Sequence, residues 1–118
     1  MSNLSLLERR IIKSERDGEQ WADLHAKWLQ LNEDKKSFLA ALINDLDDGK
    51  MSEAKLERLA LGSKAYRDYV VGLAIAKGEE LRAKVRYENS TALFSAAQSD
   101  QSLERAKIEK GIFHTGGK

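Results

Sequence analysis

The chain contains no cysteine and no proline among its 118 residues. Without cysteine it can form no disulfide, no thiolate metal site and no cysteine nucleophile, a composition typical of proteins in a reducing compartment. Without proline, long helices can run uninterrupted, which favours helices over a loop-rich β-sandwich. We therefore expect a cytoplasmic protein built from helices.

Long hydrophobic runs are also lacking. The longest apolar stretch spans residues 69–76, is interrupted by Gly72 and is too short to cross a bilayer. Residues 1–10 include Glu8, Arg9 and Arg10 and no long apolar segment, so we expect no signal peptide. The sequence predicts no membrane association.

Neither sign of charge dominates, since 20 Lys and Arg residues oppose 19 Asp and Glu residues for a net charge of +1. The strongly basic composition of many nucleic-acid-binding proteins is therefore absent. The charge is nevertheless unevenly distributed. Residues 19–50 hold four basic and seven acidic residues, whereas residues 63–98 hold six basic and four acidic residues.

Apolar residues recur at intervals of three and four from Glu19 to Asp47, which predicts a long helix with one apolar stripe. The same spacing is typical of a coiled-coil seam. Four members of the stripe form the candidate partner or oligomer interface, with burial in the chain's own core as the alternative. The stripe comprises those four residues, Trp21, Leu24, Trp28 and Leu31, together with Phe38 and Leu42.

Residues 47–50, Asp-Asp-Gly-Lys, predict the end of this helix, with Gly49 in the left-handed conformation. Ser52 is the expected N-cap of a short helix over Glu53–Leu61, and a second break follows at residues 62–63. The acids before Gly49 do not form a calcium loop, because Leu46 and Lys55 would occupy its third and twelfth positions.

A third helix is predicted from Lys64 to about Ala97, and a further short helix from Ser102 to Lys110, with a glycine-containing tail over residues 111–118 that is expected to fray. Residues 4–14 are another helical candidate, either joined to the first helix or separated from it at Gly18. The apolar stripe expected on the third helix comprises Tyr66, Tyr69, Val70, Leu73, Ala76, Leu81, Val85, Ala92 and Phe94.

Together these elements predict an all-α fold, a helical hairpin of two long antiparallel helices with short flanking helices and coiled-coil-like packing. Residues 1–18 would form a basic N-terminal segment, residues 19–98 the hairpin core, and residues 99–118 a short helix and flexible tail. Two long helices with narrow apolar stripes bury little surface, so a homo-oligomer is expected. The alternative is a monomer in which the two terminal segments fold back to complete a four-helix packing.

The sequence contains no recognisable catalytic, metal-binding or cofactor-binding motif. It has two histidines, His25 and His114, and both are expected at the surface. Nucleophile-elbow, zinc-protease, phosphate-loop and dinucleotide-loop patterns do not occur. We expect a protein without enzymatic activity, metal or cofactor, and an enzyme only if carboxylates cluster in three dimensions.

The most suggestive chemical feature is a basic segment around residues 81–87. Cations along a helix could follow a phosphate backbone while an aromatic ring stacks on a base. Nearby glutamates offset these charges, so an ordinary solvated helix face is the alternative. Arg9, Arg10, Lys13 and Arg16 form another basic cluster that could join this segment in an oligomer. The candidate nucleic-acid-binding residues are Lys77, Arg82, Lys84, Arg86 and Tyr87.

Two groups of short motifs resemble known proteins. Residues 82–89, Arg-Ala-Lys-Val-Arg-Tyr-Glu-Asn, followed by Ser99, Ser102 and residues 104–106, resemble small bacteriophage proteins associated with recombination. Residues 27–29, the break at residues 48–50 and Tyr66 are similar in layout to UvsY-type recombination mediators, over about residues 21–98. The resemblance implies a small oligomer that binds single-stranded DNA and helps to load a RecA-like recombinase.

Two functional hypotheses follow. The first is a non-enzymatic bacteriophage accessory protein of DNA recombination or replication that binds single-stranded DNA, a recombinase or both in the host cytoplasm. The second is a protein–protein interaction module, such as a phage inhibitor of a host defence complex or an adaptor.

Overall fold

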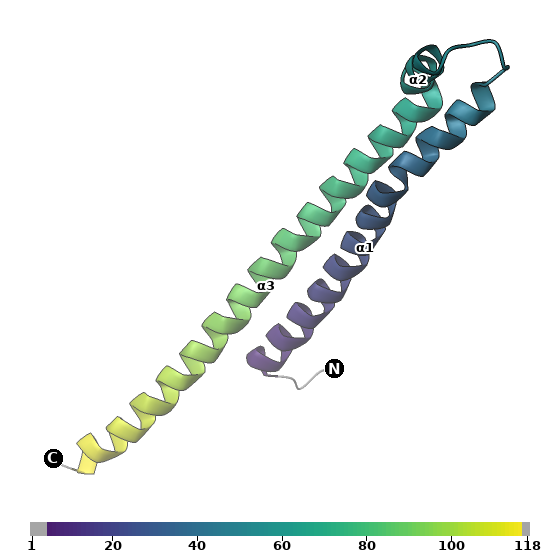
Figure 1. Cartoon of the computed structure of the whole chain (residues 1–118). Helices are drawn as coiled ribbons and strands as arrows, with labels where there is room; N and C mark the ends of the chain where they lie inside the picture. The colour runs from purple at the N-terminus through teal and green to yellow at the C-terminus, as the bar shows by residue number, and fades with distance from the viewer. Residues whose placement is uncertain (1–4, 117–118) are drawn as a thin grey trace. The chain divides into compact units, whose positions relative to one another are not determined.

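The protein is an all-α helical hairpin, as predicted (Figure 1). The computed structural model describes the backbone of residues 5–116 and the side chains of residues 5–109. Its three helices are α1 (Leu6–Leu46), α2 (Glu53–Leu61) and α3 (Lys64–Gly116), and α1 packs against α3. No strand occurs within residues 5–116, and none of these helices offers a stretch apolar and long enough for a membrane span.

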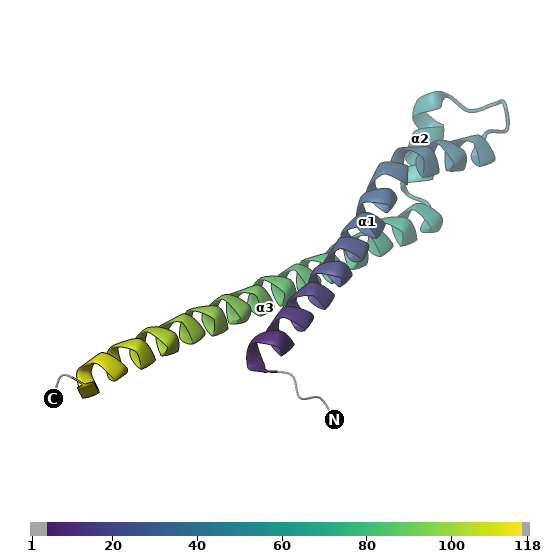
Figure 2. The same ribbon diagram turned by 90° about the horizontal axis from the view of Figure 1, so that it is seen from below.

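The chain divides into two units, which we name by their contents. The hairpin unit, Ala22–Arg82, contains the second part of α1, all of α2 and the start of α3. The terminal unit combines Met1–Trp21 with Ala83–Lys118, so that the start of α1 lies with the rest of α3. Figure 2 shows the loop that leads from the end of α1 into α2 in the hairpin unit.

Side-chain pairs show that α1 and α3 are antiparallel within each unit. In the hairpin unit His25 bonds to Glu80, while Phe38, later in α1, stacks on Tyr69, which is earlier in α3. In the terminal unit the order is likewise reversed, because Ser14 bonds to Thr91 and Gln20 to Arg86.

Helix α1 begins at Leu6 rather than near Glu19 and continues through Gly18. Of the two alternatives for residues 4–14, joining the first helix is confirmed and a separation at Gly18 was wrong. Ser5 caps the N-terminus of α1, accepting from the backbone N–H of Glu8 at 3.1 Å. Gly18 is helical rather than a break, and its missing side chain makes room for Tyr87. A Cβ at position 18 would lie 2.9 Å from Cε1 of Tyr87.

The predicted turn and short helix are confirmed. Gly49 has a φ of +78°, and its backbone N–H donates to Oδ1 of Asp47 at 2.9 Å. Ser52 caps α2 by accepting from the N–H of Lys55 at 3.2 Å. Ser63 caps α3 in the same way, through the N–H of Tyr66 at 3.1 Å.

The predicted end of the third helix near Ala97, with a separate helix from Ser102, was wrong. Helix α3 is continuous from Lys64 to Gly116, because residues 79–110 contain no glycine or proline that would end it. The tail expected to fray is helical over residues 111–116, and residues 117–118 lie outside the described residues. Within residues 5–116, the terminal segments extend α1 and α3 and form no separate helices for a four-helix packing.

The seam of α3 against α1 follows a seven-residue repeat of small side chains. Ala76, Ala83 and Ser90 are spaced by seven and expose 5%, 0% and 2% of their surface. Small residues at one repeat position allow close approach of the facing helix. The expected stripe on α3 was partly wrong, because its members Val70, Leu81, Val85 and Ala92 are exposed.

Candidate interaction surfaces

The five predicted nucleic-acid-binding residues are divided between the two units. In the hairpin unit, Nζ of Lys77 lies 3.2 Å from Oε2 of Glu80 and 4.0 Å from the centroid of the Trp28 ring. Arg82 is exposed, and its guanidinium covers Gly78, with Nη1 3.4 Å from the position of a Cβ there. Lys77 is therefore turned toward α1, whereas Arg82 remains on the surface.

The other three predicted residues lie in the terminal unit. Lys84 is 3.9 Å from the Glu88 carboxylate, and Arg86 donates to Gln20 at 3.4 Å. Tyr87 stacks on Trp21, with ring centroids 5.5 Å apart and planes inclined by 30°. The Tyr87 ring thus lies in the seam between α1 and α3, where it fills the space over Gly18.

The predicted interface residues Trp21, Leu24, Trp28 and Leu31 are all half-buried on the face of α1 that meets α3. Trp21 stacks on Tyr87 in the terminal unit, and Trp28 lies beneath Lys77 in the hairpin unit. The Tyr69 hydroxyl donates to the backbone carbonyl of Leu31. The structure therefore places these side chains in packing within the chain, the alternative that their spacing left open.

A buried carboxylate interrupts the apolar seam of the hairpin unit. Glu80 exposes 3% of its surface and accepts from Nδ1 of His25 at 3.1 Å through one oxygen. Its other oxygen lies 3.2 Å from Nζ of Lys77. Lys77 is three residues earlier on the same helix, whereas His25 comes from α1. Because a buried carboxylate is costly without such partners, this group favours the register of α1 against α3 that brings His25 to it. The burial of Glu80 could not be predicted from the apolar spacing of α3, because Glu80 is itself polar.

Asp17 occupies a similar position in the terminal unit. Its carboxylate lies 2.9 Å from Nζ of Lys13. The hydrogen bond from Lys13 lowers the pKa of Asp17 below its ordinary value, against the opposing effect of burial and with further help from Ser90 and Arg86. One turn away, the hydroxyls of Ser14 and Thr91 are 3.1 Å apart. These polar contacts tie α1 to α3 within this unit.

Phe38 and Tyr69 form the aromatic contact near the turn of the hairpin unit. Their centroids are 4.4 Å apart and their planes differ by 19°. Burial of the phenol, with repulsion from Asp34, raises the pKa of Tyr69. The hydroxyl therefore stays protonated and donates to α1 over the neutral pH range.

An exposed apolar surface lies on the side of α3 that faces away from this seam in the hairpin unit. We call it the outer face and define it as Val70, Val71, Ala74, Ile75 and Leu81. Val71, Ile75 and Leu81 expose 56%, 55% and 46% of their surfaces. At about 100° per residue, Val71 lies roughly 160° around the helix from the seam residue Tyr69. Helix α3 is therefore apolar on two opposite sides, only one of which α1 covers.

A basic surface lies on the start of α1 in the terminal unit. Arg9, Lys13 and Arg16 border a shallow depression on one side of α1. Arg86 of α3 joins this surface through its bond to Gln20, one turn beyond Arg16. We call Arg9, Lys13, Arg16 and Arg86 the basic flank.

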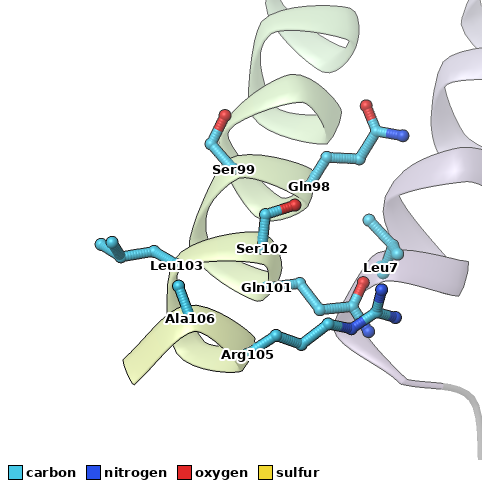
Figure 3. Close-up of a pocket in the computed structure, with 8 residues that line it drawn as sticks. All are labelled: Leu7, Gln98, Ser99, Gln101, Ser102, Leu103, Arg105 and Ala106. Carbon is cyan, nitrogen blue, oxygen red and sulfur yellow. The ribbon is translucent and has the colours of Figure 1, made fainter. Parts of the chain in front are cut away.

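Concave surfaces are shallow in the part of the chain that the structure describes. The depression in Figure 3 lies between Leu7 of α1 and the α3 segment from Gln98 to Ala106. Gln98, Gln101 and Arg105 reach toward α1, while Leu103 points away from it. The lining side chains are exposed or half-buried. Among the described residues, no three His, Asp or Glu side chains converge in a way that could hold a metal ion.

These features define a class of protein, the helical hairpin. Its seam has a seven-residue repeat and contains buried polar groups, and its helix α3 carries a second apolar side, the outer face, that α1 does not cover. No protein-family model, no curated protein and no solved structure matches the chain.

Proposed function

We propose that the protein is a non-catalytic protein-interaction module that binds another polypeptide through the outer face of α3. The observation that carries this proposal is the exposure of Val71, Ile75 and Leu81 on a helix whose opposite side is already packed. Burial of such a surface supplies the main driving force of most protein association. The proposal corresponds to the adaptor hypothesis of the sequence analysis.

The placement of aromatic residues supports this function over one centred on residues 77–87. Tyr87 is stacked in the seam, and Lys77 is turned toward Glu80 and Trp28. A base-stacking surface made from Tyr87 would therefore require the seam of the terminal unit to open.

The test is capture from an extract of the source organism, followed by reconstitution with the purified partner. Val71→Glu places a charge on the outer face, whereas Ile108→Glu introduces one at an equally exposed residue elsewhere on α3. Binding by the wild type and Ile108→Glu, but not by Val71→Glu, supports the proposal. Equal binding by all three proteins, each with unchanged helicity, contradicts it.

A second candidate function is weak binding of single-stranded DNA, and the basic flank favours it. Arg9, Lys13, Arg16 and Arg86 are exposed cations from two helices, spaced so that they could contact successive phosphates. Arg86 was among the residues predicted to bind nucleic acid. With the resemblance to recombination mediators, such binding would suit an accessory factor that works beside a RecA-like recombinase.

A further inference from the structure

We propose that the outer face of α3 binds the same face of a second copy of this chain, with the two α3 helices antiparallel and a twofold axis at Ile75. This inference rests on the proposed function, because it identifies the polypeptide that covers the same surface.

The order of residue sizes along the outer face is suited to such a pairing. Val71, Ala74, Gly78 and Leu81 are separated by three, four and three residues, the spacing of a coiled-coil seam. In an antiparallel pair whose twofold axis passes Ile75 on one edge of the face and Lys77 on the other, the core pairs are centred midway between these two residues, at the level of residue 76. Ala74 then lies opposite Gly78 of the second copy, and Val71 lies opposite Leu81 of the second copy. The guanidinium of Arg82 covers Gly78 in the single chain, and in the pair it would turn from Gly78 to Asp68 of the second copy. The small residues would then let the two backbones approach closely, with the branched side chains filling the space on either side.

The charges beside the outer face are symmetric about the same residue. Asp68 and Arg82 lie seven residues before and seven residues after Ile75, on one edge of the face. A twofold axis at Ile75 therefore places each Asp68 opposite an Arg82. Within the described residues Arg82 makes no ion pair, and Asp68 makes an exposed one with Lys64 at 3.3 Å, which water screens. Such self-complementarity is the requirement of a twofold interface.

The opposite edge of the face carries Lys77, which would meet Lys77 of the second copy. Its ammonium is, however, directed toward α1, where it contacts the Glu80 carboxylate and the Trp28 ring. Packing within the chain thus removes the like-charge contact that would oppose the pairing.

The size of the surface predicts weak association. Residues 64–82 form a strip about 28 Å long and about 10 Å wide, or roughly 280 Å² in projection. This area is below the roughly 800 Å² per partner that is usual for stable interfaces. We therefore expect a dimer that dissociates in the micromolar range.

Sedimentation equilibrium of the full chain from about 5 to 500 μM tests the pairing. We expect the average mass to rise toward that of a dimer for the wild type. Ile75→Glu should weaken association by at least about tenfold, because it places two carboxylates at the axis. The matched control Ile108→Glu, at a residue 59% exposed against 55% for Ile75, should associate like the wild type. A wild-type monomer at every concentration, or a dimer that Ile75→Glu leaves intact, overturns the proposal.

Charge-exchange variants and cysteine variants test the antiparallel register. Asp68→Arg and Arg82→Asp should each weaken the dimer, and the double variant should restore it. Because the chain has no cysteine, Ile75→Cys can form a disulfide only between two copies. Asp68→Cys should not cross-link, since its two copies would lie about 21 Å apart, beyond disulfide reach. A double variant as weak as the single ones, or cross-linking at position 68 instead of 75, contradicts this register.

The result also separates this inference from the proposed function. If the purified chain remains monomeric but a captured partner binds the wild type and not Val71→Glu, self-pairing is wrong and the proposal of a protein-interaction module is supported. If the chain is monomeric and Val71→Glu captures every protein that the wild type does, both proposals fail.

Discussion

Gly18 of α1 and the ring of Tyr87 in α3 face each other in the terminal unit, where a Cβ on residue 18 would lie 2.9 Å from Cε1 of the tyrosine ring. The ring cannot withdraw freely, because its neighbour is Trp21, 5.5 Å away between centroids. Position 18 is therefore restricted to glycine by packing, although glycine is a poor helix former.

A pair of glycine substitutions tests this restriction. Gly72→Ala, at a helical position with no atom within 4 Å of the new Cβ, should raise the free energy of unfolding by up to about 1 kcal/mol through helix propensity. Gly18→Ala should lose that gain and lower the free energy of unfolding by about 1 kcal/mol, because the Tyr87 ring must move. Urea denaturation followed by circular dichroism measures both. An equal stabilisation by the two variants would show that the contact is loose.

Removal of the buried carboxylate at position 80 should destabilise the hairpin unit. We expect Glu80→Ala to lower the free energy of unfolding by about 1–3 kcal/mol, since His25 loses its hydrogen-bond acceptor and Lys77 loses its opposite charge. Glu88→Ala serves as the control, because its exposed pair with Lys84 at 3.9 Å should contribute less than about 0.5 kcal/mol. Thermal unfolding compares them, and equal losses would assign Glu80 no special role.

The lowered pKa of Asp17 predicts a loss of stability in acid. Its folded-state pKa lies below the unfolded value near 3.8, so its contribution is present above that pH and is lost as pH falls through the folded value. Asp17→Asn should therefore flatten the dependence of unfolding free energy on pH below about 4. Urea titrations at several acidic pH values measure this slope. A slope identical in the variant and wild type would contradict the assignment.

The basic flank gives a prediction for single-stranded DNA. If it binds, the affinity for a labelled oligonucleotide should fall steeply with salt, and Arg16→Ala/Arg86→Ala should reduce the magnitude of the slope of log K against log salt by roughly 1.4. Fluorescence anisotropy measures both quantities. The control Arg58→Ala/Arg67→Ala removes two exposed cations from the hairpin unit and should leave the slope unchanged. No salt-sensitive binding at micromolar protein would reject this candidate function.

Local signals were sufficient to predict the turn and the second helix. Ser52 and Gly49 act through their immediate neighbours, so their roles can be inferred without knowledge of α1 or α3. The start of α1 had an equally local signal that the sequence analysis missed. Ser5 and Glu8 have the spacing of a capping box, and their side chains are 3.1 Å apart.

The faces of α3 could not be assigned from hydrophobicity alone. Glu80 and Ser90 are buried although both are polar, because Ser90 belongs to the seven-residue series of the seam and Glu80 lies one turn after its member Ala76. Val70 and Leu81 are apolar but lie on the outer face. Hydrophobic periodicity merged these two sides into one stripe, because it counts apolar residues and cannot recognise a polar group whose partners come from another helix.

The division of the two tryptophans between the two units has a practical consequence. Trp21 belongs to the terminal unit and Trp28 to the hairpin unit, so each unit contains its own fluorophore. In Trp21→Phe the remaining emission reports on the hairpin unit, and in Trp28→Phe it reports on the terminal unit. Coincident emission transitions would show that the two units melt as one cooperative body, and separate transitions would resolve an intermediate in which one is intact.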